Sequence, residues 1–442
     1  MRIFLKQLLV SVLLWEARLV VRKYRPRIVA VTGSVGKTGT KDAIFSVLAG
    51  NFHVRKSDKS FNSEIGVPLT ILGCPNAWNN PLRWLQNIID GLLLLALPTR
   101  YPEWLVLEVG ADRPGDISSL ASWLPVDVAV ITRLPEVPVH VEFFDSPAEV
   151  VAEKASLIAA LKKDGSLVLY GDDAQTRELA ALAQTKGNPV YFFGLQTGDV
   201  QGSALSYIYK EAGTEKTPIG ITAEIAIGSP LQSIPVSAPL SIVGAVGEPL
   251  LLASLAAVAV GSVLGQTLEH MLRVLESQEL PLGRMRLLPG IKNTLIIDDT
   301  YNASPAAVTA ALDTLQALSV SGKKIAVLGD MLELGRYSVE EHRKVGAYVV
   351  GKVDLLATVG FRARGIAEAA LNNGFPDAGI LQYEDAEKAG EEIELLLNPG
   401  DCVLLKGSQS IRMERAVEAI MAEPERASEL LVRQNQEWKK KR

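Results

Sequence analysis

Short apolar runs that end in glycine or polar residues alternate with longer segments of helical periodicity along most of the chain. Helical patterns such as SPAEVVAEKASLIAALKK (146–163) separate these runs. Strands that alternate with helices in this way predict a largely parallel sheet covered by helices. The first series of strand-like runs is RIVAVTG (27–33), WLVLEVG (104–110), VDVAVIT (126–132), GSLVLYG (165–171) and PVYFFG (189–194).

The pattern changes at residues 196–240, where short alternating runs rich in Gly, Ser, Thr and Pro predict a small antiparallel patch. The apolar segment 249–265 then predicts a buried helix. A second series of strand-like runs begins near Arg286: TLIIDDT, KIAVLGD, LLATVG, ILQYED and DCVLLKG. We therefore expect an α/β protein with a central domain at 26–282, which has a mostly parallel sheet, and a Rossmann-like α/β domain at 283–442.

Residues 1–25 form a separate, basic and apolar helical segment. The first 27 residues carry seven basic side chains and a single acid around the apolar run LLVSVLLW (8–15). A membrane-spanning helix needs about 20 mostly apolar residues, and polar or charged residues interrupt this stretch: Lys6, Gln7, Ser11, Glu16 and Arg18. No small-residue cleavage site follows, which argues against a secretory signal. The alternatives are a helix packed on the protein or a partner subunit, an interfacial membrane helix, and a true span.

Composition excludes several classes of protein. The net charge of −5 argues against a dominant nucleic-acid-binding role. The chain has only two cysteines, Cys74 and Cys402. A disulfide framework and a cysteine-built zinc site are therefore excluded, and we expect a reducing, cytosolic compartment. Apolar residues make up 48% of the 442 residues, which is ample for the cores of two or three domains.

The segment AVTGSVGKTGTKD (30–42) has the pattern of a phosphate-binding loop between a strand and a helix that we expect from about Thr40. Glycines let backbone N–H groups turn toward phosphate oxygens, and the helix N-terminus adds the positive end of its dipole. Lys37 would reach the β- and γ-phosphates of a nucleotide, and Thr38 would bind Mg²⁺. The spacing G-x-x-G-K-T is shorter than the standard loop, so a tight turn with an incidental lysine is the alternative.

Further positions are candidates for ligand binding, each with a plainer alternative. Glu108 and Asp112 flank the carboxyl end of a predicted strand, the edge at which ligands gather in open α/β sheets, although solvated or capping carboxylates also occur there. His140 is one of four histidines, and a lone histidine is more often structural. Lys154 lies in a predicted helix and by itself is expected to face solvent.

The segment IIDDTYNASPAAV (296–308) places two aspartates at the end of an apolar strand. Asn302 or Ser304 is expected to cap the helix that follows. Such polar residues at the carboxyl end of a strand favour a ligand surface, and an ordinary strand–helix turn is the alternative.

Together these motifs resemble the Mur ligases, ATP-dependent enzymes that join amino acids or peptides to peptidoglycan precursors, and most of all the MurF type, which adds D-alanyl-D-alanine. The short phosphate loop is similar to the family's own variant. The resemblance covers about residues 26–425. Other similar segments are KSFNSEIGVPLTIL (59–72), LEVGADRPGDI (107–117), DDTYNASPAAVTAAL (298–312), VLGDMLELG (327–335) with His342 shortly after it, and GDCVLLKGSQSIRMERAVEAI (400–420).

The resemblance implies a central P-loop ATPase domain and roles for individual residues. The residues that would bind ATP are Gly33, Ser34, Gly36, Lys37, Thr38, Arg284, Asp299 and Asn302. Those that would lie around Mg²⁺ are Thr38, Glu108, His140 and Lys154. Lys154 matches the position at which the family carries a carbamylated lysine, whose negative charge can hold a second Mg²⁺. Lys37, His140 and Lys154 would be the catalytic residues.

The implied reaction is the ATP-dependent joining of a carboxylate to an amine. ATP would phosphorylate the carboxylate, and the amine would attack the acyl phosphate, with ADP and phosphate as products. The resemblance implies ATP and Mg²⁺ as cofactors, and a peptidoglycan-precursor peptide and D-Ala-D-Ala or a similar amine as substrates. It implies a cytoplasmic protein, and residues 1–25 could place it at the inner face of the membrane or against a partner subunit.

Three departures from the MurF pattern bear on the substrate. MurF-type enzymes have a UDP-binding domain before the phosphate loop, whereas about 30 residues precede Gly33 here. Tyr170 stands where asparagine is usual, and the segment 243–261 lacks the usual His and Asn, so we expect an altered adenine pocket. The alternatives to a MurF-type ligase are therefore a ligase with a lipid-linked acceptor, another amide ligase such as a folylpolyglutamate synthase or a lipid II-amidating enzyme, and a non-catalytic nucleotide-binding scaffold.

Overall fold

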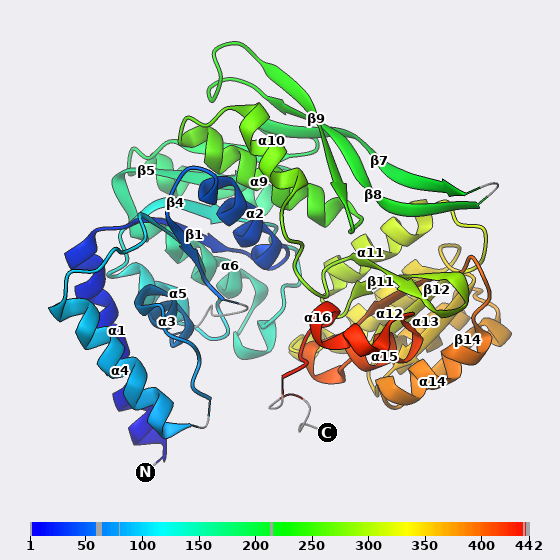
Figure 1. Cartoon of the computed structure of the whole chain (residues 1–442). Helices are drawn as coiled ribbons and strands as arrows, with labels where there is room; N and C mark the ends of the chain where they lie inside the picture. The colour runs from blue at the N-terminus through cyan, green and yellow to red at the C-terminus, as the bar shows by residue number, and fades with distance from the viewer. Residues whose placement is uncertain (1, 59–63, 79, 213–214, 436–437, 439–442) are drawn as a thin grey trace.

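The computed structural model describes residues 2–58, 64–78, 80–212, 215–435 and 438, which form two sheets with helices around them (Figure 1). The first sheet has the strand order β2-β3-β1-β4-β5-β6-β7-β8-β9, and the second has the order β10-β11-β15-β12-β13-β14. Most neighbouring strands in both are parallel, so the expected α/β class is confirmed. Residues 59–63, which begin the segment KSFNSEIGVPLTIL, lie outside the described residues.

The first sheet joins a parallel half to an antiparallel extension. Its parallel strands are β1 (Arg27–Thr32), β2 (Val54–Lys56), β3 (Trp104–Glu108), β4 (Val126–Ile131), β5 (Leu161–Tyr170) and β6 (Val190–Gly194). The antiparallel strands are β7 (Val200–Ala212), β8 (Glu215–Ile227) and β9 (Val236–Val243). The predicted antiparallel patch is therefore present, but its strands are long and continue the main sheet. Tyr209 of β7 reaches the C-terminal half, where its hydroxyl accepts a hydrogen bond from the N–H of Ser319 at 3.0 Å.

Helices cover both faces of this sheet. One face carries α2 (Lys37–Ala49), α9 (Glu248–Val263) and α10 (Leu268–Glu276). The other face carries α1 (Arg2–Tyr24), α3 (Gly66–Leu72), α4 (Pro81–Ala96), α5 (Asp116–Ala121), α6 (Pro147–Ala155), α7 (Ala174–Glu178) and α8 (Ala180–Gln184). Apolar residues that point to opposite sides of each strand supply the two cores, as the period of a β-strand requires.

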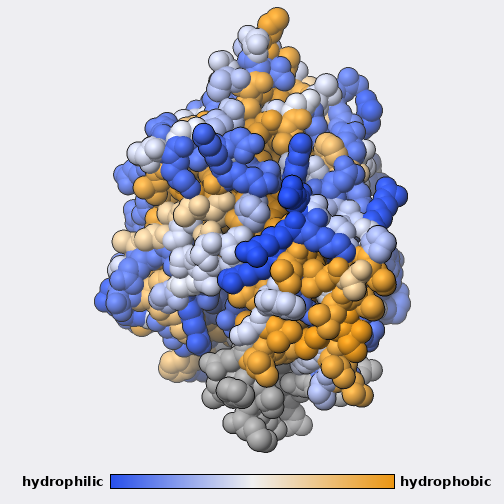
Figure 2. All heavy atoms as spheres, turned by 90° about the vertical axis from the view of Figure 1, so that its left-hand side faces the viewer, coloured by the Kyte–Doolittle hydropathy of each residue, from blue (hydrophilic) through white to orange (hydrophobic). Residues whose placement is uncertain are grey.

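The N-terminal helix α1 packs on the protein, as one of its three alternatives predicted. Its buried side chains Leu13, Ala17 and Val20 belong to the core beneath the sheet, and α1 lies beside α3 and α4. Figure 2 shows the face that α1 and α4 occupy, with a hydrophobic area at its lower right. No helix in the described part of the chain is long and apolar enough to cross a membrane.

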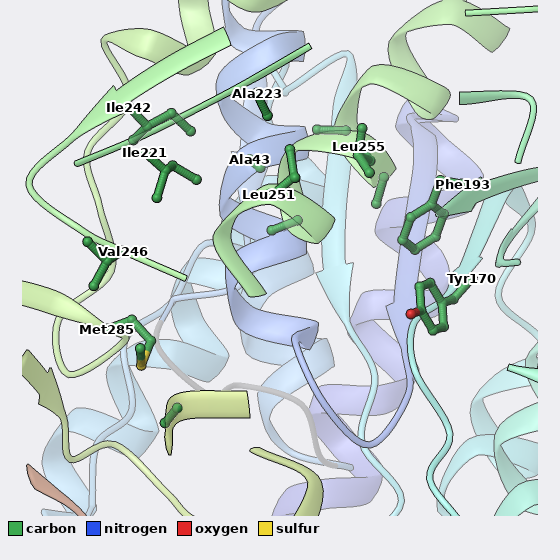
Figure 3. Close-up of a cluster of buried hydrophobic side chains, with 14 of the residues drawn as sticks. Ala43, Tyr170, Phe193, Ile221, Ala223, Ile242, Val246, Leu251, Leu255 and Met285 are labelled. Carbon is green, nitrogen blue, oxygen red and sulfur yellow. The ribbon is translucent and has the colours of Figure 1, made fainter. Parts of the chain in front are cut away.

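The buried helix predicted at 249–265 is α9, which is confirmed. Figure 3 shows Leu251 and Leu255 of α9 in the same buried hydrophobic cluster as Ile221 and Ala223 of β8. A helix that is apolar on all sides is stable only when protein surrounds it, and here the sheet, α2 and α10 do so. This packing also fixes the position of α2, the helix that follows the phosphate-loop segment.

The helical segment predicted at 146–163 is shorter than expected. α6 ends at Ala155, a short 3₁₀ helix covers Ser156–Ala160, and β5 begins at Leu161. Lys162 lies in the strand, where its ammonium group pairs with Asp127 of β4 at 2.8 Å. Pairing between neighbouring strands therefore overrides the helical pattern of the last three residues.

The second sheet forms the C-terminal half. Its strands are β10 (Arg286–Gly290), β11 (Thr294–Asp299), β12 (Lys324–Gly329), β13 (Leu355–Val359), β14 (Ile380–Tyr383) and β15 (Cys402–Lys406). β10 runs antiparallel to β11, and the other neighbours are parallel. The helices around it are α11 (Pro305–Ala317), α12 (Ser338–Val349), α13 (Arg364–Asn372), α14 (Ala386–Leu396), α15 (Glu414–Ile420) and α16 (Ala427–Leu430). Ser304 caps α11 by accepting a hydrogen bond from the N–H of Ala307 at 3.3 Å.

The expected domain boundary at residue 282 falls between α10 and β10 and stays a prediction.

Candidate active site

The loop between β1 and α2 has the geometry that a phosphate loop requires. Gly33 and Gly36 have φ values of 139° and 87°, which side-chain-bearing residues rarely adopt. A Cβ atom on Gly33 would lie 2.0 Å from the hydroxyl oxygen of Thr132, so only glycine fits there. α2 begins at Lys37, earlier than the expected Thr40, because Gly36 makes the turn into the helix. The Lys37 ammonium group folds back and donates a hydrogen bond to the carbonyl of Gly33 at 3.0 Å.

Charged residues from both halves of the chain surround Lys37. Burial lowers the pKa of Lys37, and the Arg284 guanidinium group acts in the same direction. The carboxylates of Glu108, Asp112 and Glu333 oppose this shift. Glu108 and Asp112 come from the first sheet, whereas Arg284 and Glu333 come from the C-terminal half. The candidate site therefore lies between the two halves.

Glu108 is a candidate for a cation ligand beside the loop. It is the last residue of β3 and is almost fully buried. Thr38 donates a hydrogen bond from its hydroxyl to Glu108 Oε1 at 3.3 Å, whereas Oε2 is buried and has no hydrogen-bond partner in the described chain. A buried, unpartnered carboxylate oxygen is costly, and a divalent cation would satisfy it. Among the described residues, no group of three or more His, Cys, Asp or Glu side chains is arranged to hold a metal ion by itself.

Lys154 is completely buried, so the expectation that it faces solvent was wrong. α6 turns this side chain inward, toward Lys37 and Asp112. Its ammonium nitrogen has no hydrogen-bond partner within the described residues. Burial, assisted by the positive charge of Lys37, lowers the pKa of Lys154 to about 7. A large fraction of this amine is therefore neutral at physiological pH, unlike a surface lysine.

His140 connects the two halves of the chain. Its Nδ1 atom lies 2.8 Å from Glu333 Oε2, and its Nε2 atom lies 3.7 Å from Asp112 Oδ1. The contact with His140 lowers the pKa of Glu333. Both His140 and Glu333 have left-handed backbones, with φ values of 69° and 64°. Side-chain-bearing residues adopt this conformation at a cost, and such residues cluster at functional sites.

Two of the three residues in the C-terminal half that were expected to bind ATP, Asp299 and Asn302, lie around a buried lysine. Lys406 donates hydrogen bonds to Asp299 Oδ2 at 2.5 Å and to the carbonyl of Asn302 at 2.9 Å. Lys406 and Asp299 are both buried, so Asp299 is engaged within the protein rather than free. Arg284 lies over the ring of Tyr301, with 4.2 Å between the guanidinium carbon and the ring centroid.

A hollow beside the loop corresponds to the place where we expected an altered adenine pocket. Gly36, Tyr170 and Phe193 line it, together with Arg133 and the N-terminus of α9 at Glu248. The rings of Tyr170 and Phe193 are 5.7 Å apart between centroids, and Figure 3 shows them side by side. Tyr170 therefore forms part of the wall of this hollow.

Three residues of this region were missed in the sequence analysis: Arg133, Glu333 and Lys406. Each follows or ends a strand of its sheet: Arg133 comes soon after β4, Glu333 soon after β12, and Lys406 ends β15. The rule that identified Glu108, a polar residue at the carboxyl end of a strand, would have found all three. His342 is not among the charged groups that act on Lys37. Its Nε2 atom accepts a hydrogen bond from the N–H of Met331 at 3.0 Å, which serves the local structure.

Comparison with known proteins assigns the family. Residues 83–232 match the Mur ligase middle domain, and residues 283–409 match the Mur ligase, glutamate ligase domain. The UDP-N-acetylmuramoyl-tripeptide–D-alanyl-D-alanine ligase of Bacillus subtilis is 31% identical over 399 residues, which cover 90% of this chain and 76% of that enzyme. The corresponding ligase of Haemophilus influenzae is 29% identical and matches over 89% of this chain and 77% of its own length.

A solved structure agrees with these matches. The MurF ligase of Thermotoga maritima, determined in complex with ADP, superposes with a TM-score of 0.73 at 28% identity, over 93% of this chain and 83% of that one. The phosphate loop and the charged residues around it thus lie in a fold that binds an adenine nucleotide. The chain belongs to the Mur ligase family of ATP-dependent, amide bond-forming ligases and is a MurF-like ligase of peptidoglycan precursor synthesis.

Proposed function

We propose that this ligase joins D-Ala-D-Ala, or a similar amine, to the carboxylate of a peptidoglycan-precursor peptide. One observation carries the proposal: Lys37, Glu108 and Lys154 converge beside the glycine loop, and Glu108 and Lys154 each keep a buried polar atom without a partner in the described chain. The similarity to the Bacillus subtilis enzyme, which is named for this substrate pair, supports the choice of substrates.

The nucleotide side of the reaction uses the loop and its lysine. The N–H groups of Gly33, Ser34 and Gly36 would hold phosphate oxygens at the N-terminus of α2. Lys37 would neutralise the charge on the transferring phosphoryl group, which is the main electrostatic task in such reactions. Arg284 lies close enough to Lys37 to affect its pKa, so we assign it a contact with the nucleotide.

The unpartnered atoms are suited to metal binding. Thr38 and Glu108 Oε2 would hold Mg²⁺, which supplies charge neutralisation at the phosphates when bound. Lys154 has the neutral amine that reaction with carbon dioxide requires: the nitrogen forms a bond to carbon, a proton leaves, and the product is a carbamate anion. This anion would add a second carboxylate-like ligand near Asp112. His140 would position Asp112 and Glu333 around the same charges.

The carboxylate of the acceptor peptide would react after ATP has activated it. The γ-phosphoryl group of ATP moves to a carboxylate oxygen of the acceptor, and ADP leaves. The amine then attacks the acyl carbon, and the tetrahedral intermediate expels phosphate as the amide forms. Enclosure of the acyl phosphate between the two halves of the chain would protect it from hydrolysis.

An ADP-release assay tests the proposal. Purified protein receives ATP and Mg²⁺ with UDP-linked tripeptide, with and without D-Ala-D-Ala, and the same series is run with a lipid-linked precursor. We expect ADP release that depends on both the UDP-linked tripeptide and D-Ala-D-Ala. Turnover of the lipid-linked precursor but not of the UDP-linked tripeptide would favour the lipid-linked alternative, and no ADP release with any pair would favour the scaffold alternative.

We place the enzyme in the cytoplasm.

A further inference from the structure

Helix α4 turns a stripe of large aliphatic side chains away from the protein. Its opposite face packs toward α1 through Trp84, Ile88, Leu94 and Leu95. The outward side chains recur at intervals of three and four residues, so they share one face of the helix. Each is at least 46% exposed, and together they are Leu82, Leu85, Ile89, Leu92 and Leu93. We call these five residues the α4 stripe.

Further exposed apolar residues extend this surface. Leu97 follows the end of α4, Trp78 precedes its start, and Leu8 and Trp15 are exposed on α1. In Figure 2 the hydrophobic area at the lower right lies beside elongated hydrophilic side chains on the same face. A contiguous apolar patch bordered by polar residues is a candidate docking surface.

The charges around the stripe are mostly positive, although the whole chain has a net charge of −5. Residues 8–27 and 80–103 contain seven basic side chains and three acidic ones. The exposed basic side chains include Arg22, Lys23, Arg25, Arg83 and Arg100. Glu16, the acid within α1, is fully buried against Gly91, and burial raises its pKa to about 7. This acid therefore contributes little negative charge to the surface.

A basic hollow lies at the C-terminal end of α1. Arg18, Arg22, Arg25 and Lys162 line this open cavity of about 630 Å³ together with Trp123. The Arg18 guanidinium carbon lies 5.4 Å from the centroid of the Trp123 ring, and its Nε atom is buried without a hydrogen-bond partner in the described part of the chain. The hollow has the charge and the open shape to accept an anionic group such as a phosphate.

We propose that the face formed by α1 and α4 docks on an anionic lipid membrane. The α4 stripe would lie among the acyl chains near the surface, and the arginines of α1 would lie among the headgroup phosphates. This is the arrangement of an interfacial amphipathic helix, with tryptophans at the boundary between lipid and water. The basic charge complements anionic lipid.

A second copy of the chain fits this surface less well. α4 has 16 residues, so its stripe measures about 24 Å by about 10 Å. The stripe alone therefore offers about 240 Å², whereas a stable protein–protein interface needs about 800 Å² from each partner. A symmetric pair would also bring the basic residues of both copies together.

The chain turns from α1 directly into β1, the strand that precedes the phosphate loop. A two-residue turn joins α1 to β1, so the helix runs antiparallel to the strand. The N-terminal end of α1 therefore points in the same direction as the carboxyl end of β1, which the phosphate loop follows (Figure 1). This inference does not depend on the proposed substrates, since it concerns only the surface.

Vesicle sedimentation tests the proposal. Full-length protein is mixed with vesicles of equal parts phosphatidylglycerol and phosphatidylcholine, or of phosphatidylcholine alone. We expect binding that is at least tenfold tighter to the anionic vesicles. The variant L85E/I89E/L92E should lose at least tenfold in affinity. The double variant R22S/R25S should lose about fivefold for each basic residue removed, and the loss should shrink at high salt.

A matched control separates the stripe from exposed apolar residues in general. Phe361 and Leu395 are 79% and 77% exposed in the C-terminal half, so F361E/L395E should bind vesicles like the wild type. All variants should keep the wild-type thermal unfolding curve, because the changed side chains are exposed. No binding of the wild type to anionic vesicles, or equal binding by L85E/I89E/L92E, would overturn the proposal. A dimer in sedimentation equilibrium that this variant abolishes, without vesicle binding, would assign the surface to self-association instead.

Discussion

Replacement of Lys154 by methionine should stabilise the protein while it removes activity. Lys154 is fully buried, without a partner for its ammonium nitrogen in the described chain. Its pKa falls from 10.5, the ordinary lysine value, to about 7. Each tenfold change in a protonation equilibrium is worth about 1.4 kcal/mol, so burial of this lysine costs about 4 kcal/mol at pH 7. Methionine has a similar length and carries no charge, so it avoids this cost.

The pH dependence gives the prediction its sign. Between pH 7 and 10.5 the unfolded chain holds a proton on Lys154 and the folded chain does not, so the free energy of unfolding of the wild type rises with pH. The free energy of unfolding of Lys154→Met lacks this contribution from the titration of Lys154. Its advantage should be about 4 kcal/mol at pH 7, should stay near that value at lower pH, and should disappear as the pH approaches 10.5.

Urea unfolding at pH 6, 7, 8 and 9 measures the effect, in buffer free of carbon dioxide, nucleotide and Mg²⁺. The exposed Lys163 of β5 supplies the control, because Lys163→Met should change stability by at most about 0.5 kcal/mol at every pH. Loss of stability in Lys154→Met, or a gain that does not change with pH, would refute the reasoning. In the ligase assay Lys154→Ala should be nearly inactive and partly rescued by short carboxylates, which would substitute for the carbamate.

Three further substitutions test other parts of the site and fold. Lys37→Ala should lower turnover by about 10²-fold or more in an ADP-release assay, and near-wild-type turnover would rule out the phosphate-loop assignment. Glu16→Gln should stabilise the protein by about 3 kcal/mol at pH 8 and by little at pH 4.5. The raised pKa of Glu16 makes the wild type lose stability as the pH rises from 4.5 to about 7, and glutamine avoids this loss. Equal urea midpoints of the two proteins at pH 8 would contradict this prediction. Lys406→Met should lower the free energy of unfolding, measured with urea, by about 3 to 5 kcal/mol, because it leaves the carboxylate of Asp299 buried and unpaired. An unchanged urea midpoint would show that Asp299 is not buried as a charge.

The arrangement of strands and helices was largely predictable because it depends on local patterns. Apolar runs indicated the parallel strands of both sheets except the short edge strand β2, and the all-apolar segment 249–265 indicated α9. The end of the helix at 146–163 was not predictable from periodicity, because the pairing of Lys162 with Asp127 that places it in β5 joins residues 35 positions apart.

The site was predictable where a residue ends a strand, as at Glu108, or belongs to the glycine loop that opens α2, as at Lys37 and Thr38. Lys154 was not, since a helical position does not reveal which face will be covered. The contact between His140 and Glu333 depends on how the two halves of the chain meet, which no local pattern encodes. The apolar surface likewise lies mainly on α4 rather than in the N-terminal segment that the sequence analysis considered.

Isotope transfer tests most directly whether this enzyme activates a carboxylate with ATP. The reacting carboxylate of UDP-linked tripeptide is labelled with ¹⁸O, and the protein receives it with ATP, Mg²⁺ and D-Ala-D-Ala. An acyl phosphate intermediate transfers one labelled oxygen to the phosphate that leaves, so mass spectrometry should find one ¹⁸O atom in each phosphate released with an amide bond. Release of unlabelled phosphate, or no phosphate release at all, would contradict the proposed ligase reaction.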